Sequence, residues 1–188
     1  MVDITSRSSI IRRGELRKCV ELLGTEYTLL PYKIYVYRDR EEVQAEMINN
    51  PDMDIKDYNY ILNNVSYQPP GVCLHEKKLI KLFPFNNDPS NPAMQKLHSV
   101  GNAFHELRHA WQQINGMYIE EAEQKLDSEN IEDYLTRPSE RDAYEFQEQQ
   151  MNKNQIKISD ILGFHGIGYN YTCDIKATIL RIKVGKKG

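Results

Sequence analysis

A pair of histidines four residues apart, inside the longest helical pattern of the chain, constrains the fold more than any other feature. Residues 92–115 carry apolar side chains at helical spacing on two sides, which predicts a helix central to the fold, and Pro92 suits its first turn. Inside it, residues 105–109 read His-Glu-Leu-Arg-His, the HExxH pattern. Four helical residues make slightly more than one turn, so His105 and His109 share a face and can bind one ion.

Glu106 lies between these histidines in the sequence and provides a carboxylate that can transfer protons. It flanks the expected ion without ligating it, so its carboxylate can take a proton from a metal-bound water. It can then pass that proton to a leaving amine. The pattern predicts a Zn²⁺ site with His105 and His109 as ligands and Glu106 as general base. The alternative interpretation is a pair of surface histidines on an amphipathic helix.

A catalytic zinc site needs a third protein ligand. Gln112 and Asn115 stand where the metzincin pattern requires Gly and His, which excludes that class. A glutamate from a following helix is another common solution. Glu140 falls in the first turn of a helical pattern over 137–151, one turn before Ala143, whose small side chain lets two helices approach closely. We therefore expect Glu140 to be the third metal ligand. The remaining candidates are Glu145, Glu120, Glu121 and Glu123.

The two motifs together resemble the compact gluzincin metallopeptidases of the ImmA/IrrE type, in which HExxH is followed by a helix of pattern Glu-x-x-Ala-x-x-Phe. Here residues 140–146 read Glu-Arg-Asp-Ala-Tyr-Glu-Phe. The resemblance implies a zinc metallopeptidase with a zincin-like α+β fold, in which a small twisted β-sheet packs on the HExxH helix and a glutamate-bearing helix follows. It implies His105, His109 and Glu140 as zinc ligands and Glu106 as general base.

The resemblance also implies that the strand before the metal helix, residues 79–83, edges the cleft and pairs with extended substrate. Two departures from the family pattern matter. Larger gluzincins place an Asp four residues after the ligand glutamate, whereas this chain has Tyr144, so the partner that orients the histidine ligands is unassigned. The chain also lacks a recognisable helix-turn-helix, so a role linked to transcription is not supported.

Glycines surround a histidine near the C-terminus, where residues 163–169 read Gly-Phe-His-Gly-Ile-Gly-Tyr. His165, Tyr169 or Tyr171 can donate a hydrogen bond to the oxyanion of a tetrahedral intermediate. His165 and Tyr169 are therefore candidate catalytic residues. The alternative is a loop histidine next to tyrosines that pack in the core.

The sequence around Cys73 invites comparison with peptide deformylases, which combine HExxH with a cysteine ligand in a Gly-Cys-Leu turn. Here residues 71–75 read Gly-Val-Cys-Leu-His, a different order, so we interpret Cys73 as a buried strand residue. His98 lies seven residues before His105, about 10 Å along the helix, which is too far to join the same ion. His75 is interpreted as an exposed turn residue.

Two alternatives to a peptidase stay open at this point. One is a non-catalytic interaction protein that keeps the zincin fold, with or without metal. The other is a metal-dependent hydrolase of a different amide bond, as in the deformylases. The partner expected for the peptidase is a peptide or protein substrate.

The composition of the chain limits the partners and the cell compartment that we expect for it. Lys plus Arg total 24 and Asp plus Glu total 27, giving a net charge of −3, which argues against a surface built for nucleic acid or membrane. No apolar run approaches 18 residues, and the N-terminus lacks the pattern of a signal peptide. Three cysteines without a CxxC pair fit a reducing compartment. We expect a cytoplasmic protein.

At 188 residues the chain has room for one domain, over 1–188. It is expected to comprise a helical N-terminal segment (1–30), the site-bearing centre, and a basic C-terminal segment (153–188). Predicted helices cover 8–23, a short stretch capped by Asp39 with Glu42, 55–65, 92–115 and 137–151. Predicted strands cover 32–37, the hairpin 72–74 and 79–83, and 175–184.

Overall fold

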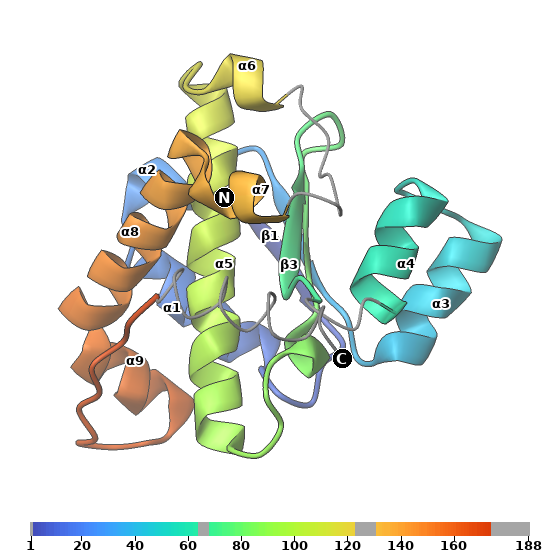
Figure 1. The fold of residues 1–188 in the computed structure, drawn as a ribbon. Helices are drawn as coiled ribbons and strands as arrows, with labels where there is room; N and C mark the ends of the chain where they lie inside the picture. The colour runs from blue at the N-terminus through green and yellow to red at the C-terminus, as the bar shows by residue number, and fades with distance from the viewer. Residues whose placement is uncertain (1, 64–67, 123–130, 174–188) are drawn as a thin grey trace.

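The computed structural model describes residues 2–63, 68–122 and 131–173, which have the expected α+β architecture (Figure 1). The strands in these ranges are β1 (Asp3–Ser6), β2 (Lys33–Val36), β3 (Gly71–Leu74) and β4 (Leu79–Leu82). The helices are α1 (Arg13–Glu21), α2 (Thr25–Thr28), α3 (Arg40–Asn49), α4 (Ile55–Asn63), the 3-10 turn η1 (Pro84–Asn86), α5 (Pro92–Ile114), α6 (Ile119–Ala122), α7 (Ile131–Thr136), α8 (Pro138–Lys153) and α9 (Gln155–Leu162). None of the helices in these ranges combines the length and apolar character needed to cross a lipid bilayer.

The four strands form one sheet in the order β1-β2-β4-β3. β1, β2 and β4 run parallel, and β3 pairs antiparallel with β4. The expectation that residues 79–83 edge the cleft and pair with extended substrate is therefore wrong. β4 has a paired strand on each side, because it joins β2 in parallel as well as closing the hairpin with β3. The hairpin partner β3 is the edge strand at this end of the sheet. Among the described strands its outer side has no pairing partner, so an added strand could pair there.

The N-terminal segment also differs from its prediction. Instead of a helical segment over 1–30 with a helix over 8–23, the structure has strand β1 followed by the shorter helix α1. Val2 and Ile4 alternate with polar residues, which is the period of a half-buried strand. Val2 and Ile4 are 3% and 1% exposed and belong to the hydrophobic core, and Ile4 pairs with Ile34 of β2. Burial of this alternating face therefore outweighs helix formation at the start of the chain.

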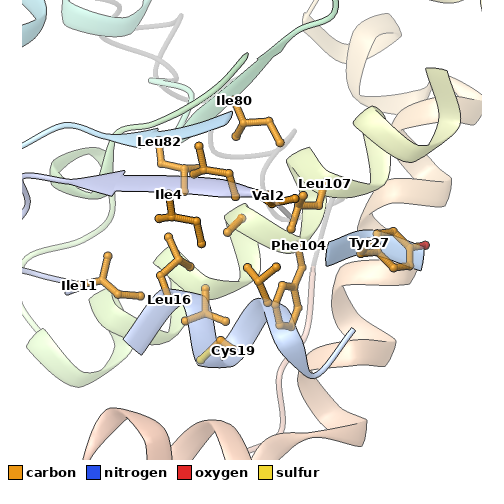
Figure 2. Packing of buried hydrophobic residues seen from close by; sticks show 14 of the residues in the cluster. Val2, Ile4, Ile11, Leu16, Cys19, Tyr27, Ile80, Leu82, Phe104 and Leu107 are labelled. Carbon is orange, nitrogen blue, oxygen red and sulfur yellow. The ribbon is translucent and has the colours of Figure 1, made fainter. Parts of the chain in front are cut away.

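One face of the sheet packs on α5 and α1, and Figure 2 shows this core from close by. Ile4, Ile34 and Ile80 are register partners across three strands and form one apolar row. Phe104 of α5 and Leu16 of α1 belong to the same cluster and are fully buried. The prediction of a central helix is confirmed, because α5 contacts the sheet on one side and α8 on the other (Figure 1).

The opposite face of the sheet is covered by α3 and α4. Asp39 caps α3 as predicted, since its side chain accepts a hydrogen bond from the backbone N–H of Glu42 at 2.9 Å. Beneath these helices Lys81 is fully buried and forms ion pairs with Glu46 and, at 3.3 Å, with Asp52. A buried lysine needs such compensation, and the ion pairs connect β4 to the α3–α4 layer.

Helix α8 packs on the side of α5 that faces away from the sheet, and α9 follows it (Figure 1). α8 runs along α5, and α9 continues from α8 to contact α1. The sequence patterns did not predict α9. Few charged residues separate its apolar positions, and the residues that follow it are rich in glycine. The predicted strand over 175–184 lies outside the described residues.

Candidate metal centre

The side chains of His105, His109 and Glu140 converge where the first turn of α8 meets α5. The Nε2 atoms of the two histidines lie 3.0 Å apart. Oε2 of Glu140 lies 3.2 Å from Nε2 of His105, and Oε1 lies 3.3 Å from Nε2 of His109. Within the described ranges this is the one group of three His, Cys, Asp or Glu side chains close enough to share an ion.

The group fits Zn²⁺ in both donor type and spacing. Imidazole nitrogen and carboxylate oxygen bind zinc at about 2.0–2.2 Å, so neighbouring ligands of a tetrahedral ion lie about 3.3 Å apart. The separations here run from 3.0 to 3.3 Å. Two imidazole nitrogens that face one another and share a single carboxylate also form a donor set that favours a cation.

Burial and charge act against each other in this group. Burial is the largest single influence and would lower the pKa of His109, but the charge and hydrogen bond of Glu140 raise it to about 9. Burial would likewise raise the pKa of Glu140, yet the two histidines hold it far below its usual range. Glu140 is 3% exposed, and its carboxylate stays ionised at neutral pH because its contacts with the two histidines outweigh the effect of burial.

Two residues of α8 set the approach of the helices. Ala143 is fully buried one turn after Glu140, and its small side chain permits the close packing of α8 on α5 that the sequence predicted. Tyr144 lies with its ring centroid 4.4 Å from that of His105. The tyrosine therefore packs on a histidine of the site and lines the same cavity.

Glu106 lies beside this group and faces strand β3. Its side chain is 7% exposed and belongs to the wall of the cavity that His105 and His109 also line. Burial raises the pKa of Glu106, with the two histidines opposing the shift. Gly71 of β3 leaves the space that the carboxylate occupies, because a Cβ at that position would lie 2.9 Å from Oε1 of Glu106. The expected general base is thus next to the expected ligands.

The cavity has a volume of about 360 Å³ and is bounded by four parts of the fold. The edge strand β3 (Gly71–Leu74) forms one wall, and α5 with the start of α8 forms the floor that carries the metal group. Tyr60 and Ile61 of α4 line it on one side, and Tyr134 of α7 lines it on another. A cavity this size is typical of a ligand or substrate site.

The structure does not bring His165 and Tyr169 to the cavity, so their proposed contact with an oxyanion is wrong for this arrangement. The unpredicted helix α9 carries the chain away, and His165 is exposed, 3.6 Å from Asp160. The hydroxyl of Tyr169 instead donates to the backbone carbonyl of Met151 at 3.1 Å. Tyr171 is buried, and its hydroxyl contacts Gln147 at 2.7 Å.

The other residues considered as ligands lie outside the metal group, some in the cavity wall and some away from the cavity. Cys73 and His75 both line the cavity, with Sγ of Cys73 3.5 Å from Nδ1 of His75, but neither belongs to the metal group. His75 is half-buried rather than exposed, and burial lowers its pKa to about 4. His98 instead contacts the hydroxyl of Tyr171 at 3.2 Å. Of the alternative acids, Glu145 and Glu120 are exposed, Glu121 lines the cavity without joining the metal group, and Glu123 lies outside the described residues.

The sequence did not predict Gln112, which contacts the ring nitrogen of His109 farther from the other ligands, or its partner Asp142. In the sequence Gln112 stands out only as a departure from the metzincin pattern, and nothing in the pattern singles out Asp142. In the structure Nδ1 of His109 lies 2.9 Å from Oε1 of Gln112, and Nε2 of Gln112 donates to Asp142 at 2.6 Å. The available signal was spacing, because a residue three positions after a helical ligand lies on the same face.

Comparisons with protein-family models, with curated proteins and with solved structures found no match to this chain.

Proposed function

We propose that this protein is a zinc-dependent metallopeptidase of the compact gluzincin type, resembling the ImmA/IrrE enzymes, on a zincin-like fold. One observation carries the proposal: His105, His109 and Glu140 converge within ligand distance, and Glu106 lies buried beside them in the same cavity. The two motifs are separated by 30 residues in sequence, so their meeting is a property of the fold.

In this proposal each residue has one task. His105, His109 and Glu140 hold the ion, which, when bound, supplies a Lewis acid that polarises the substrate carbonyl and acidifies water. The carboxylate of Glu106 accepts a proton from the attacking water and later delivers it to the nitrogen of the leaving amine. Its burial next to Gly71 keeps this carboxylate away from bulk solvent and on the cavity side of α5.

The edge strand favours a peptide over a small amide as substrate. β3 pairs with β4 on one side within the described sheet, and its residues line the cavity along the other. An extended chain can add to such an edge through backbone hydrogen bonds, which suit substrates of varied sequence. Cys19, Cys73 and Cys173 are all free thiols, which fits work in the reducing cytoplasm.

The test combines zinc content with turnover on the full chain. Glu106→Gln is expected to bind one zinc ion per chain, measured by atomic emission, and to lose at least 100-fold in cleavage of a fluorogenic peptide library, because its amide cannot accept the proton. Glu140→Ala is expected to lose zinc. The matched control is Glu145→Ala, which removes an exposed carboxylate from the same helix.

Specific outcomes would overturn the proposal. Normal zinc content in Glu140→Ala would refute the ligand assignment, and undiminished cleavage by Glu106→Gln would refute the role of the base. Zinc binding with no cleavage of any library member, but hydrolysis of N-formyl peptides, would place the activity with other amides. Zinc loss in Cys73→Ala would favour the same reading.

A further inference from the structure

Behind the metal group, a chain of hydrogen bonds leads from His109 to the outer surface of the α5–α8 pair. Nδ1 of His109 meets Oε1 of Gln112 at 2.9 Å. The amide nitrogen of Gln112 donates to the backbone carbonyl of Ser139 at 3.0 Å and to Oδ2 of Asp142 at 2.6 Å. Arg108 then donates twice to Asp142, at 2.7 and 3.0 Å. Gln112 itself is 3% exposed.

These contacts define which way the amide of Gln112 points. Its two N–H donors are both used, one by Ser139 and one by Asp142, so the atom that faces His109 must be the oxygen. An oxygen there can only accept, and Nδ1 of His109 is therefore the donor. When the ring is neutral its single proton sits on Nδ1, which leaves the lone pair of Nε2 directed at Glu140 and His105.

Asp142 is itself held in place. Its two carboxylate oxygens receive the Nε and terminal N–H groups of Arg108 as a fork, the geometry with the least rotational freedom. The guanidinium lies over the ring of Trp111 at 4.1 Å and donates to the hydroxyl of Tyr27 at 2.7 Å. The orientation of Gln112 is thus anchored in aromatic packing outside the cavity.

Resting on the proposed function, we infer that Gln112 is the positioning residue of the metal centre, acting together with Asp142. It selects the tautomer of His109 and, through Ser139 and Asp142, holds the first turn of α8 that carries Glu140. A single side chain thereby fixes the orientation of one ligand on α5 and the position of another on α8. His105 has no such support among the described residues, since its buried Nδ1 lacks a hydrogen-bond partner there.

Asp142 and Gln112 together fill the role of the aspartate that larger gluzincins place four residues after the ligand glutamate. Where Tyr144 occupies the position of the expected aspartate, the carboxylate stands two residues earlier, at Asp142, and an amide bridges it to the histidine. Partners of this kind typically change metal affinity 10- to 100-fold when they are removed.

The experiment measures zinc affinity by competition with a chromophoric chelator, using the full chain. Gln112→Met keeps the length of the side chain and removes all three hydrogen bonds, so we expect binding to weaken about 10- to 100-fold. Asp142→Asn offers a single carbonyl to the donors of both Gln112 and Arg108, so it is also expected to weaken zinc binding. The matched control Gln149→Met alters an exposed glutamine of α8 and is expected to bind zinc like the wild type.

A double-mutant cycle separates positioning from a purely structural role. Because Asp142 acts through Gln112, Asp142→Asn is expected to cause little further loss of affinity in the Gln112→Met background. The low-field Nδ1–H resonance of His109 in the zinc-loaded protein is expected to shift in Gln112→Met, which a general loss of stability would not produce. Urea unfolding of each metal-free variant checks that it folds, and if Gln112→Met does not fold, Gln112→Asn serves in its place.

Different results would refute the positioning role of Gln112 and the proposed function. Affinity within threefold of wild type in Gln112→Met, or equal effects of Asp142→Asn in both backgrounds, would overturn the positioning role while leaving the metal site intact. If the wild-type chain binds no zinc, or binds it without Glu140, the proposed function itself fails.

Discussion

A glycine opposite the proposed base shows how narrow the tolerances of this site are. A Cβ on Gly71 would lie 2.9 Å from Oε1 and 3.0 Å from Cγ of Glu106, and 3.1 Å from a side-chain carbon of Leu82. Leu82 is buried in the core, so its side chain has little room to give way. The carboxylate would have to shift instead.

We therefore expect Gly71→Ala to lower kcat about tenfold to a hundredfold, since small misplacements of reacting groups are costly. Zinc affinity should stay close to wild type, because Gly71 does not contact the ligand atoms. The measurement is steady-state cleavage of the peptide substrate alongside zinc titration. Gly14→Ala, whose added Cβ meets nothing within 4 Å, is the control. An unchanged kcat in Gly71→Ala would show that Glu106 has room to spare.

The residues of the site differ in how far sequence alone could lead to them. His105, Glu106 and His109 are separated by one helical turn, so the local geometry of an α-helix is sufficient to predict their common face. Glu140 could be proposed from its own helical pattern, but its meeting with the histidines depends on the packing of α8 on α5. The partnership of Gln112 with Asp142 depends on side-chain hydrogen bonds between those helices, which no pattern in either segment announces.

At the scale of elements, sequence patterns predicted segments better than their pairings. α5 and α8 were predicted within two residues of their observed bounds, because long amphipathic periodicity and Pro at the first turn are strong signals. The hairpin of β3 and β4 was also predicted, but its orientation in the sheet was not. Which strand becomes the edge depends on β2 pairing with β4, a contact between residues about 45 positions apart.

The segment that follows α9 illustrates how an element without regular structure can still be docked firmly. Tyr171 inserts its hydroxyl between α5 and α8, where it contacts Gln147 at 2.7 Å and His98 at 3.2 Å. The space exists because residue 101 of α5 is glycine. A Cβ on Gly101 would lie 2.7 Å from Nε2 of Gln147 and would overlap the hydroxyl of Tyr171.

Gly101→Ala is accordingly expected to lower the free energy of unfolding by about 1–3 kcal/mol, as overpacking of a core does, even though alanine favours helix. Urea denaturation of the metal-free protein measures this change. Removing the hydroxyl in the same chain, as Gly101→Ala with Tyr171→Phe, should recover part of the loss. If the double variant is no more stable than Gly101→Ala, the hydroxyl contact is not the cause.

For the whole molecule, the candidate ligands lie where the sheet-facing helix α5 meets helix α8, two elements that pack along one another (Figure 1). Without an ion, this interface contains a buried carboxylate and two imidazoles, one of which has its pKa raised to about 9. An ion that binds all three ligands joins helices from distant parts of the chain. Metal binding should therefore act on the stability of the entire fold.

With His105, His109 and Glu140 as the proposed ligands, zinc at 100 times its dissociation constant is expected to raise the free energy of unfolding by about 2.7 kcal/mol, because only the folded state brings the three together. For a chain of this size that corresponds to an increase in Tm of roughly 5–10 °C. Calorimetry with zinc and with a chelator measures the difference. Glu106→Gln should keep the full increase, since the role proposed for Glu106 begins after the metal is bound, whereas Glu140→Gln should lose most of it. An equal increase in Glu140→Gln would mean that zinc stabilises the protein from somewhere other than the interface of α5 and α8.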